Sequence, residues 1–95
     1  MDSPEIVHAT AKNRFEIRLG RTVIGQTEYR AQDGNRVFTH TEVDPELGER
    51  GLGSQLIRGA LDDVRTSTEA KVVATCPFVR RFLRLHPDYQ DLTRR

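Results

Sequence analysis

The 95-residue sequence has little of what several protein classes require. Its single cysteine, Cys76, excludes an internal disulfide and a zinc site built from several cysteines, and it favours a reducing compartment. No apolar run approaches the roughly 20 residues that span a bilayer. A net charge of +1 argues against general nucleic-acid binding, which needs a large basic face. Because the first residues also lack the basic start and apolar stretch of a secretion signal, we expect a cytoplasmic protein with no membrane or nucleic-acid partner.

Strand patterns fill the first half of the chain. Strict alternation of apolar and polar residues from Arg14 to Leu19 is typical of a half-buried strand. Asp33-Gly34 is a strong hairpin turn signal, and Gly25 predicts a bulge or a close backbone approach within a longer strand. The sequence therefore predicts an antiparallel meander with strands at residues 4–9, 14–19, 22–32 and 36–43.

The second half changes period. Apolar residues at helical spacing predict a helix from about Gly51 to about Thr66, and the β-branched residues at 71–75 predict a buried strand. A strand, a helix and a strand in one sheet form a crossover, so strands 37–43 and 71–75 should be parallel. A short helix should run from Pro77 to Pro87, followed by a short tail with Tyr89 and Leu92 as anchors. The predicted fold is one α/β (α+β) domain over residues 1–95, with a mixed, mostly antiparallel sheet.

Gly51 and Gly53 lie just before the predicted long helix. Without Cβ atoms they would let backbone N–H groups approach a phosphate at the positive end of that helix. A tight turn with close packing explains the same pattern. Neither a Rossmann fingerprint nor a P-loop fits, because the third glycine of the first and the Gly-Lys-Ser/Thr of the second are missing.

Cys76 precedes Pro77 and should therefore lie at a helix N-cap, where the helix dipole and the nearby Arg80 and Arg81 favour a thiolate. A small buried side chain is an equally good explanation of a free cysteine. His40 lies mid-strand and should share a face with Phe38 and Glu42 unless a bulge intervenes.

If the two strands are neighbours, His40 could approach Cys76 as a base approaches a nucleophile. A structural histidine that bonds the neighbouring backbone is the alternative. His8 and His86 are expected at the surface or as capping residues, and the three histidines show no zinc-ligand spacing.

Two charged clusters flank these residues. The acidic one could attract a cationic amine, although a solvated turn explains it as well. The basic one could hold a phosphate, although a role in balancing Asp62, Asp63 and Asp88 explains it as well. The acidic cluster comprises Glu42, Asp44, Glu46 and Glu49, and the basic one Arg80, Arg81 and Arg84.

Two stretches, HTEVDPELGERGLGSQLI and CPFVRRFLRLHPDY, resemble the GNAT acetyltransferase superfamily and in particular its short, single-domain acetyltransferase-like branch. The resemblance runs from about Phe15 to Tyr89. It implies a sheet that splays open between its fourth and fifth strands, with the pantetheine of acetyl-CoA in the opening.

The resemblance also implies site residues. The pantetheine would pair with the backbone at Thr41, Glu42 and Val43, and the pyrophosphate would lie on a loop spanning Gly48 to Gly53. Gly48 stands where the family has Arg or Gln, and Arg50 is the nearby residue that could supply that charge. The implied cofactor-binding residues are Thr41, Val43, Glu49, Arg50, Gly51, Leu52, Gly53, Ser54, Phe78, Val79 and Phe82.

By the same resemblance, Cys76 would be the acid that protonates the leaving thiolate, or a transient acyl carrier, and His40 or Glu42 would be the base. The expected function is acetyl transfer from acetyl-CoA to a small-molecule or peptide amine. The alternative is a non-catalytic CoA-binding or regulatory module. We expect a monomer or weak dimer, with an acceptor site that is shallow or shared with a partner.

Overall fold

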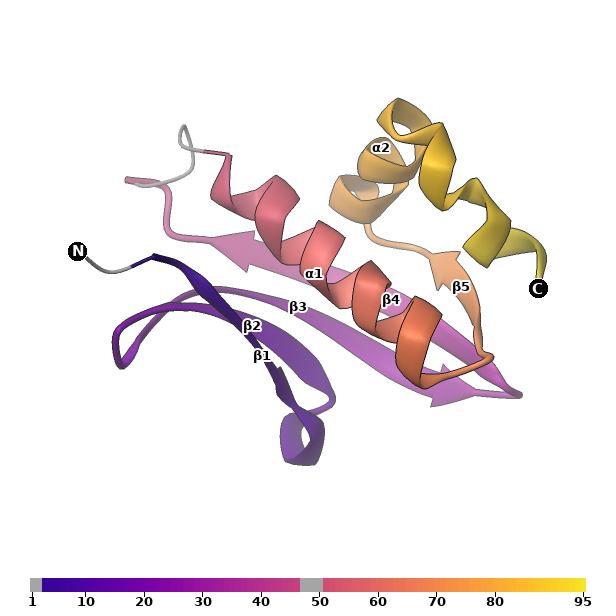
Figure 1. The fold of residues 1–95 in the computed structure, drawn as a ribbon, viewed down its shortest axis with the longest axis horizontal. Coiled ribbons are helices and arrows are strands. Elements are labelled where there is room, and N and C mark those ends of the chain that lie inside the picture. The colour runs from indigo at the N-terminus through magenta and orange to yellow at the C-terminus, as the bar shows by residue number, and fades with distance from the viewer. Residues whose placement is uncertain (1–2, 47–50) are drawn as a thin grey trace.

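The computed structural model describes residues 3–46 and 51–95, and within them five strands form one sheet in the order β1-β2-β3-β4-β5 (Figure 1). The first four strands pair antiparallel with their neighbours, and a short 3₁₀ turn at Thr10–Lys12 joins the first two. These strands are β1 (Glu5–Ala9), β2 (Arg14–Leu19), β3 (Thr22–Gln32) and β4 (Asn35–Val43). The predicted meander is confirmed.

The crossover is also present. Helix α1 (Leu52–Ser67) leads to β5 (Lys71–Ala74), which pairs parallel with β4. The chain then forms α2 (Pro77–Leu85) and a 3₁₀ helix, η3 (Pro87–Arg94). The expected short tail is therefore wrong, because these residues are helical. Its two expected anchors are correct, since Tyr89 and Leu92 are both buried.

The core lies between α1 and the sheet. The apolar stripe of α1 packs on aromatic and aliphatic side chains from β2 and β4, and the ring centroids of Phe15 and Phe38 are 6.4 Å apart. Each such buried side chain contributes about 1.5–3 kcal/mol relative to exposure. The fully buried members of this layer are Phe15, Ile17, Phe38, Leu56, Ile57, Ala60, Leu61 and Val64.

Two bulges shift the register of the sheet. Ile24 is the extra residue of β3 between the pairs Ile17↔Gly25 and Arg18↔Val23, next to the glycine that predicted it. Thr39 is the extra residue of β4 between Glu28↔His40 and Tyr29↔Phe38. An extra residue reverses the side-chain alternation beyond it.

The second bulge separates Phe38 from the polar residues that follow it. Phe38 is fully buried under α1, whereas His40 and Glu42 are exposed. The expectation that all three share a face is therefore wrong, and the one exception that was foreseen, a bulge, is the reason.

Candidate active site

Strand β4 continues beyond the point where its pairing with β5 ends. Its pairing with β5 ends at Phe38↔Ala74, and the backbone carbonyl of Phe38 accepts hydrogen bonds from Thr75 N (3.0 Å) and Cys76 N (3.2 Å) as the chain turns away. Residues 39–43 thus form an edge, called here the β4 edge, that has no β5 partner in the described chain. The fourth and fifth strands therefore part after this pair, as the family resemblance implies.

The β4 edge presents backbone groups to this opening. Asp44 N–H donates to the carbonyl of Ile24 at 2.8 Å, so the backbone of Asp44 faces β3. Because backbone groups of alternate residues face the same neighbour, those of Thr41 and Val43 face away from β3. The resemblance implies pairing at Thr41, Glu42 and Val43, but by the same alternation the backbone of Glu42 faces β3. Only Thr41 and Val43 keep backbone groups that an extended ligand could pair with.

The glycine turn lies at the start of α1. Gly51 is the N-cap with φ 72°, a left-handed conformation that glycine adopts without strain, and no side chain of residues 3–46 or 51–95 caps the helix. A methyl group at Gly53 would collide with the Phe78 ring, so close packing explains this glycine directly. Three residues of the expected loop, Gly48, Glu49 and Arg50, lie outside the described residues.

A partly apolar hollow of about 270 Å³ lies between the start of α1 and α2, called here the α1–α2 hollow. Two of its side chains are unusually exposed for their type, Phe78 at 42% and Leu85 at 58%. By contrast, Val79 is fully buried in the core and does not line it. The lining residues are Ser54, Phe78, Arg81, Phe82, Leu85 and His86.

Cys76 caps α2 at its N-terminus, as predicted, and is buried. Its thiol lies 3.4 Å from Thr41 Oγ1 and donates a hydrogen bond to it. Because neighbouring side chains of a strand point to opposite faces, His40 points away from the face on which Thr41 meets Cys76. The two residues expected to form a nucleophile–base pair are thus on opposite faces of β4, and that arrangement is corrected.

His40 instead bonds Glu42, with 2.8 Å between Nε2 and Oε1. This hydrogen bond raises the pKa of His40 above its ordinary 6.5, and the charges of Glu42 and Glu28 act in the same direction. Sequence reasoning missed Glu28, which pairs with His40 across β3 and β4, because the bulge sets that register.

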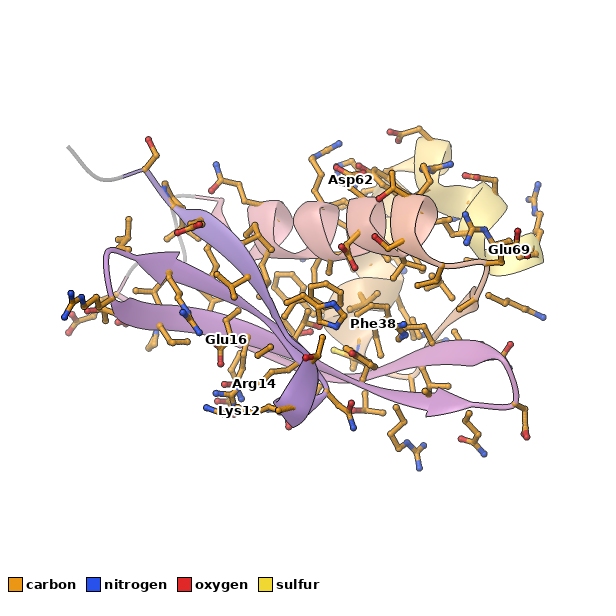
Figure 2. All side chains as sticks on the ribbon, turned by 60° about the horizontal axis from the view of Figure 1, so that its bottom comes forward. Lys12, Arg14, Glu16, Phe38, Asp62 and Glu69 are labelled. Carbon is orange, nitrogen blue, oxygen red and sulfur yellow. The ribbon has the colours of Figure 1, made fainter. Side chains whose placement is uncertain are left out.

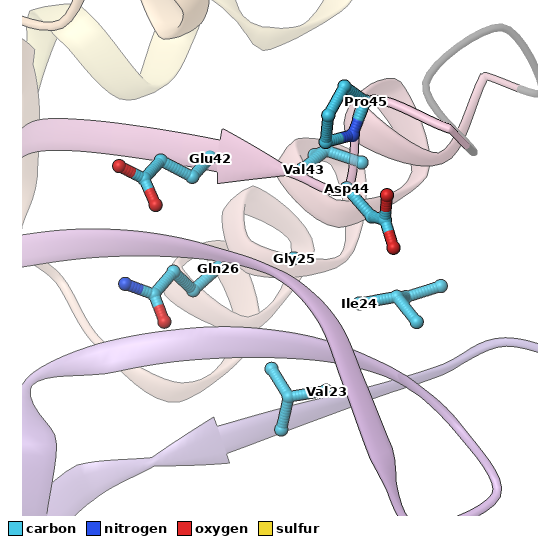
Figure 3. A pocket seen from close by; sticks show the side chains of 8 residues that line it. All are labelled: Val23, Ile24, Gly25, Gln26, Glu42, Val43, Asp44 and Pro45. Carbon is cyan, nitrogen blue, oxygen red and sulfur yellow. The ribbon is translucent and has the colours of Figure 1, made fainter.

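A second hollow of about 340 Å³ is lined in part by Glu42 (Figure 3). It is called here the β3–β4 hollow. Glu42 belongs to both the hollow and the pair with His40, and Asp44 adds a second carboxylate. Apolar side chains supply most of the remaining lining. The full set is Val23, Ile24, Gly25, Gln26, Glu42, Val43, Asp44 and Pro45.

The three arginines of α2 line a further hollow with Pro77 and make no ion pair with any described residue. Two of the three aspartates that they could have balanced bond elsewhere. Asp62 accepts a hydrogen bond from Tyr89 Oη at 2.7 Å, and Asp63 lies 3.5 Å from His8.

The other two histidines support the fold. His8 is half-buried rather than at the surface, stacks on Phe15 and lies 2.6 Å from Tyr29 Oη. His86 bonds the Phe82 carbonyl at 2.9 Å near the end of α2, in keeping with a capping role. The described residues contain no cluster of His, Cys, Asp or Glu that could hold a metal ion.

Comparison with protein families gives a match over most of the chain. A family model described as GCN5-related N-acetyl-transferase matches residues 14–92, which is most of the chain. The chain therefore belongs to this family and carries an acetyltransferase domain, whose general chemistry is acyl transfer. Comparison with curated proteins finds no match. Among the described residues, no helix is long and apolar enough to cross a membrane.

Proposed function

We propose that this protein binds acetyl-CoA in the opening between β4 and β5 and transfers its acetyl group to an amine. The observation that carries the proposal is the β4 edge, which runs on without a β5 partner and turns the backbone of Thr41 and Val43 toward the opening. A closed sheet would have left no place for the ligand.

The residues present fit the cofactor. The backbone groups of Thr41 and Val43 can pair with the amides of the pantetheine arm, as a neighbouring strand would. The start of α1 at Gly51 suits the pyrophosphate, because the first N–H groups of a helix and its dipole attract an anion. The α1–α2 hollow offers aromatic and cationic side chains to the remaining parts of acetyl-CoA. Bound acetyl-CoA supplies the thioester that carries the acetyl group.

The protein's own groups divide the proton transfers between the two faces of β4. His40, held by Glu42, accepts a proton from the ammonium form of the acceptor on the exposed face, before the neutral amine attacks the thioester. Cys76 donates its proton to the leaving thiolate on the other face. Cys76 has no imidazole or carboxylate as a hydrogen-bond partner among the described residues, so it is better suited to donate a proton than to act as an acyl carrier.

The β3–β4 hollow is our candidate for the acceptor site. Its carboxylates attract a protonated amine, and its apolar lining suits an aliphatic stem, as in an alkylamine or a lysine side chain. Because it adjoins Glu42, an amine held there lies next to the proposed base.

Binding is tested first, by titration calorimetry with CoA. Gly53→Ala should crowd Phe78 and the first amides of α1, and we expect an affinity lower by about tenfold or more, the effect of losing one hydrogen bond to a charged group. Gly59→Ala is the matched control, because Gly59 lies in the same helix as Gly53 but away from the opening. A Cβ at Gly59 would also be crowded, since it would meet Ile6 Cγ1 of β1 at 2.7 Å. Equal affinities for two folded variants would refute the phosphate assignment.

Transfer is tested second, with acetyl-CoA and butylamine, spermidine or a lysine-containing peptide as acceptors. Product should form with at least one of them and fall sharply in His40→Asn and Cys76→Ala. CoA binding without any acetylated acceptor would make the protein a binding module rather than an enzyme.

A further inference from the structure

Two threonines face each other in the interior of the sheet. Thr27 of β3 and Thr41 of β4 are paired in the register, and their Oγ1 atoms lie 2.9 Å apart. Thr27 is fully buried and Thr41 half-buried. Valine has nearly the same shape as threonine and needs no hydrogen-bond partner. Two inward hydroxyls at these positions therefore indicate that their hydrogen bonds have a function.

The hydroxyl pair ends at Cys76. Thr41 Oγ1 bonds both Thr27 and the Cys76 thiol, which gives a continuous chain of hydrogen bonds from the β3 interior to the start of α2. We infer that Thr41 is a positioning residue for the Cys76 thiol and that Thr27 holds Thr41 in place. The inference rests on the proposed function, in which Cys76 gives up a proton beside the β4 edge.

The chain can serve both protonation states of the sulfur. In the thiol form, the S–H of Cys76 donates to Thr41, and the Thr41 hydroxyl donates to Thr27. When the S–H bond breaks and its proton goes to the leaving thiolate, the Cys76 sulfur keeps the electron pair.

The hydroxyl of Thr41 then turns to donate to the sulfur anion, and that of Thr27 turns to donate to Thr41. No bond to either threonine breaks, and a proton from solvent restores the thiol. The buried anion thus gains a hydrogen bond at the moment it forms, which offsets part of the cost of charge in a buried position.

The test is the pH profile of Cys76 alkylation by iodoacetamide in the unliganded protein, because the thiolate is the reactive form. Thr41→Val removes the donor, so we expect its profile to move to higher pH by about one unit, or about tenfold slower alkylation at neutral pH. Thr41→Ser keeps the hydroxyl and should retain the wild-type profile. Thr27→Val should shift it in the same direction by less.

Thr39→Val is the matched control, because Thr39 lies on the same strand and bonds the Glu28 carbonyl rather than Cys76. Identical profiles for Thr41→Val and Thr39→Val would overturn the inference. If Thr41→Val does not fold, the alkylation profile of Thr27→Val becomes the test. A wild-type profile for Thr27→Val would then overturn the inference.

Alkylation needs neither CoA nor an acceptor, so a failure of the proposed acetyl transfer would leave this result unaffected. Where transfer is measurable, Thr41→Val should lower kcat and leave the KM for acetyl-CoA close to wild type. A packing role alone would not shift the alkylation profile while the folded state is unchanged.

Discussion

One extra residue in β4, Thr39, decides which side chains can act together. Without it, strict alternation would place His40 on the buried face with Phe38. The bulge instead turns His40 outward beside Glu42 and opposite Glu28, and it leaves Thr41 to meet Cys76. The acid and the base of the proposed reaction are thereby separated by the thickness of a strand.

The hydrogen bond between His40 and Glu42 leads to a prediction about the pH dependence of the reaction. Glu42 raises the pKa of His40, so the neutral imidazole that accepts a proton forms only as pH rises above the ordinary histidine value of 6.5. We expect kcat/KM for acetyl transfer to increase with pH through a midpoint above 6.5. Glu42→Gln removes the main cause of the shift, and its midpoint should lie at lower pH.

Glu46→Gln provides the control, since Glu46 is an exposed carboxylate of the same acidic cluster and makes no bond to His40. Its pH profile should match wild type. A midpoint in Glu42→Gln at or above the wild-type value would contradict the assignment of His40 as base.

A second residue-scale feature is the carboxylate of Glu16, which is only 1% exposed although it lies on the sheet face away from α1 (Figure 2). Arg14 Nε donates to it at 2.8 Å and Arg18 Nε at 3.0 Å. The hydrogen bond from Arg18, followed by that from Arg14, lowers the pKa of Glu16 below its ordinary 4.5 despite the opposing effect of burial.

A lowered carboxyl pKa means that the folded state holds the proton less tightly than the unfolded state does. The stabilisation is therefore complete above pH 4.5 and is lost as pH falls through the lower folded-state value. We expect Glu16→Gln to reduce the free energy of unfolding by about 1–3 kcal/mol at pH 7 and to weaken its dependence on pH in the acid range. Urea denaturation at pH 7 and at pH 3 measures both.

Glu69→Gln is the matched control, because Glu69 is exposed and has no ion pair with a described residue. If the two variants lose stability equally at pH 7, the arginines do not stabilise Glu16 as argued.

At the scale of elements, strong periodicity made the predictions reliable. The apolar stripe of α1 predicted a helix ending at about Thr66, and the helix ends at Ser67. The η3 helix was missed because its sequence is mostly polar and has only two apolar anchors. Tyr89 and Leu92 are three residues apart, the repeat of a 3₁₀ helix, and this signal is too short to distinguish from a loop.

The η3 helix holds the end of the chain to the core, and this can be measured. Leu92 is fully buried, so Leu92→Ala should lower the free energy of unfolding by about 2–5 kcal/mol through lost burial and the cavity left behind. Leu85→Ala makes the same chemical change at a side chain that is 58% exposed and should cost less than about 0.5 kcal/mol. Similar losses in chemical denaturation would mean that η3 does not pack as described.

At the scale of the whole molecule, the sheet consists of two unequal parts. Four antiparallel strands form one, and β5 joins them through only four residue pairs before α2 begins (Figure 1). The fold class followed from the sequence, because the strand and helix periodicities are local signals, whereas the parting of β4 and β5 followed only from the family resemblance. The Thr41 partner of Cys76 and the position of Glu28 opposite His40 followed from neither, because they depend on a bulge that no local pattern marks.

A ligand in the opening would join the two parts of the sheet, and amide hydrogen exchange can detect it residue by residue. The backbone groups of Thr41 and Val43 face the opening, whereas Asp44 N–H is already bonded to the Ile24 carbonyl at 2.8 Å. We therefore expect saturating CoA to slow exchange at Thr41 and Val43 and to change it much less at Asp44, beyond the general stabilisation that any ligand of the folded state gives. A uniform slowing along β4 would show only that general effect, and unchanged exchange at Thr41 and Val43 with CoA bound would place the ligand outside the opening.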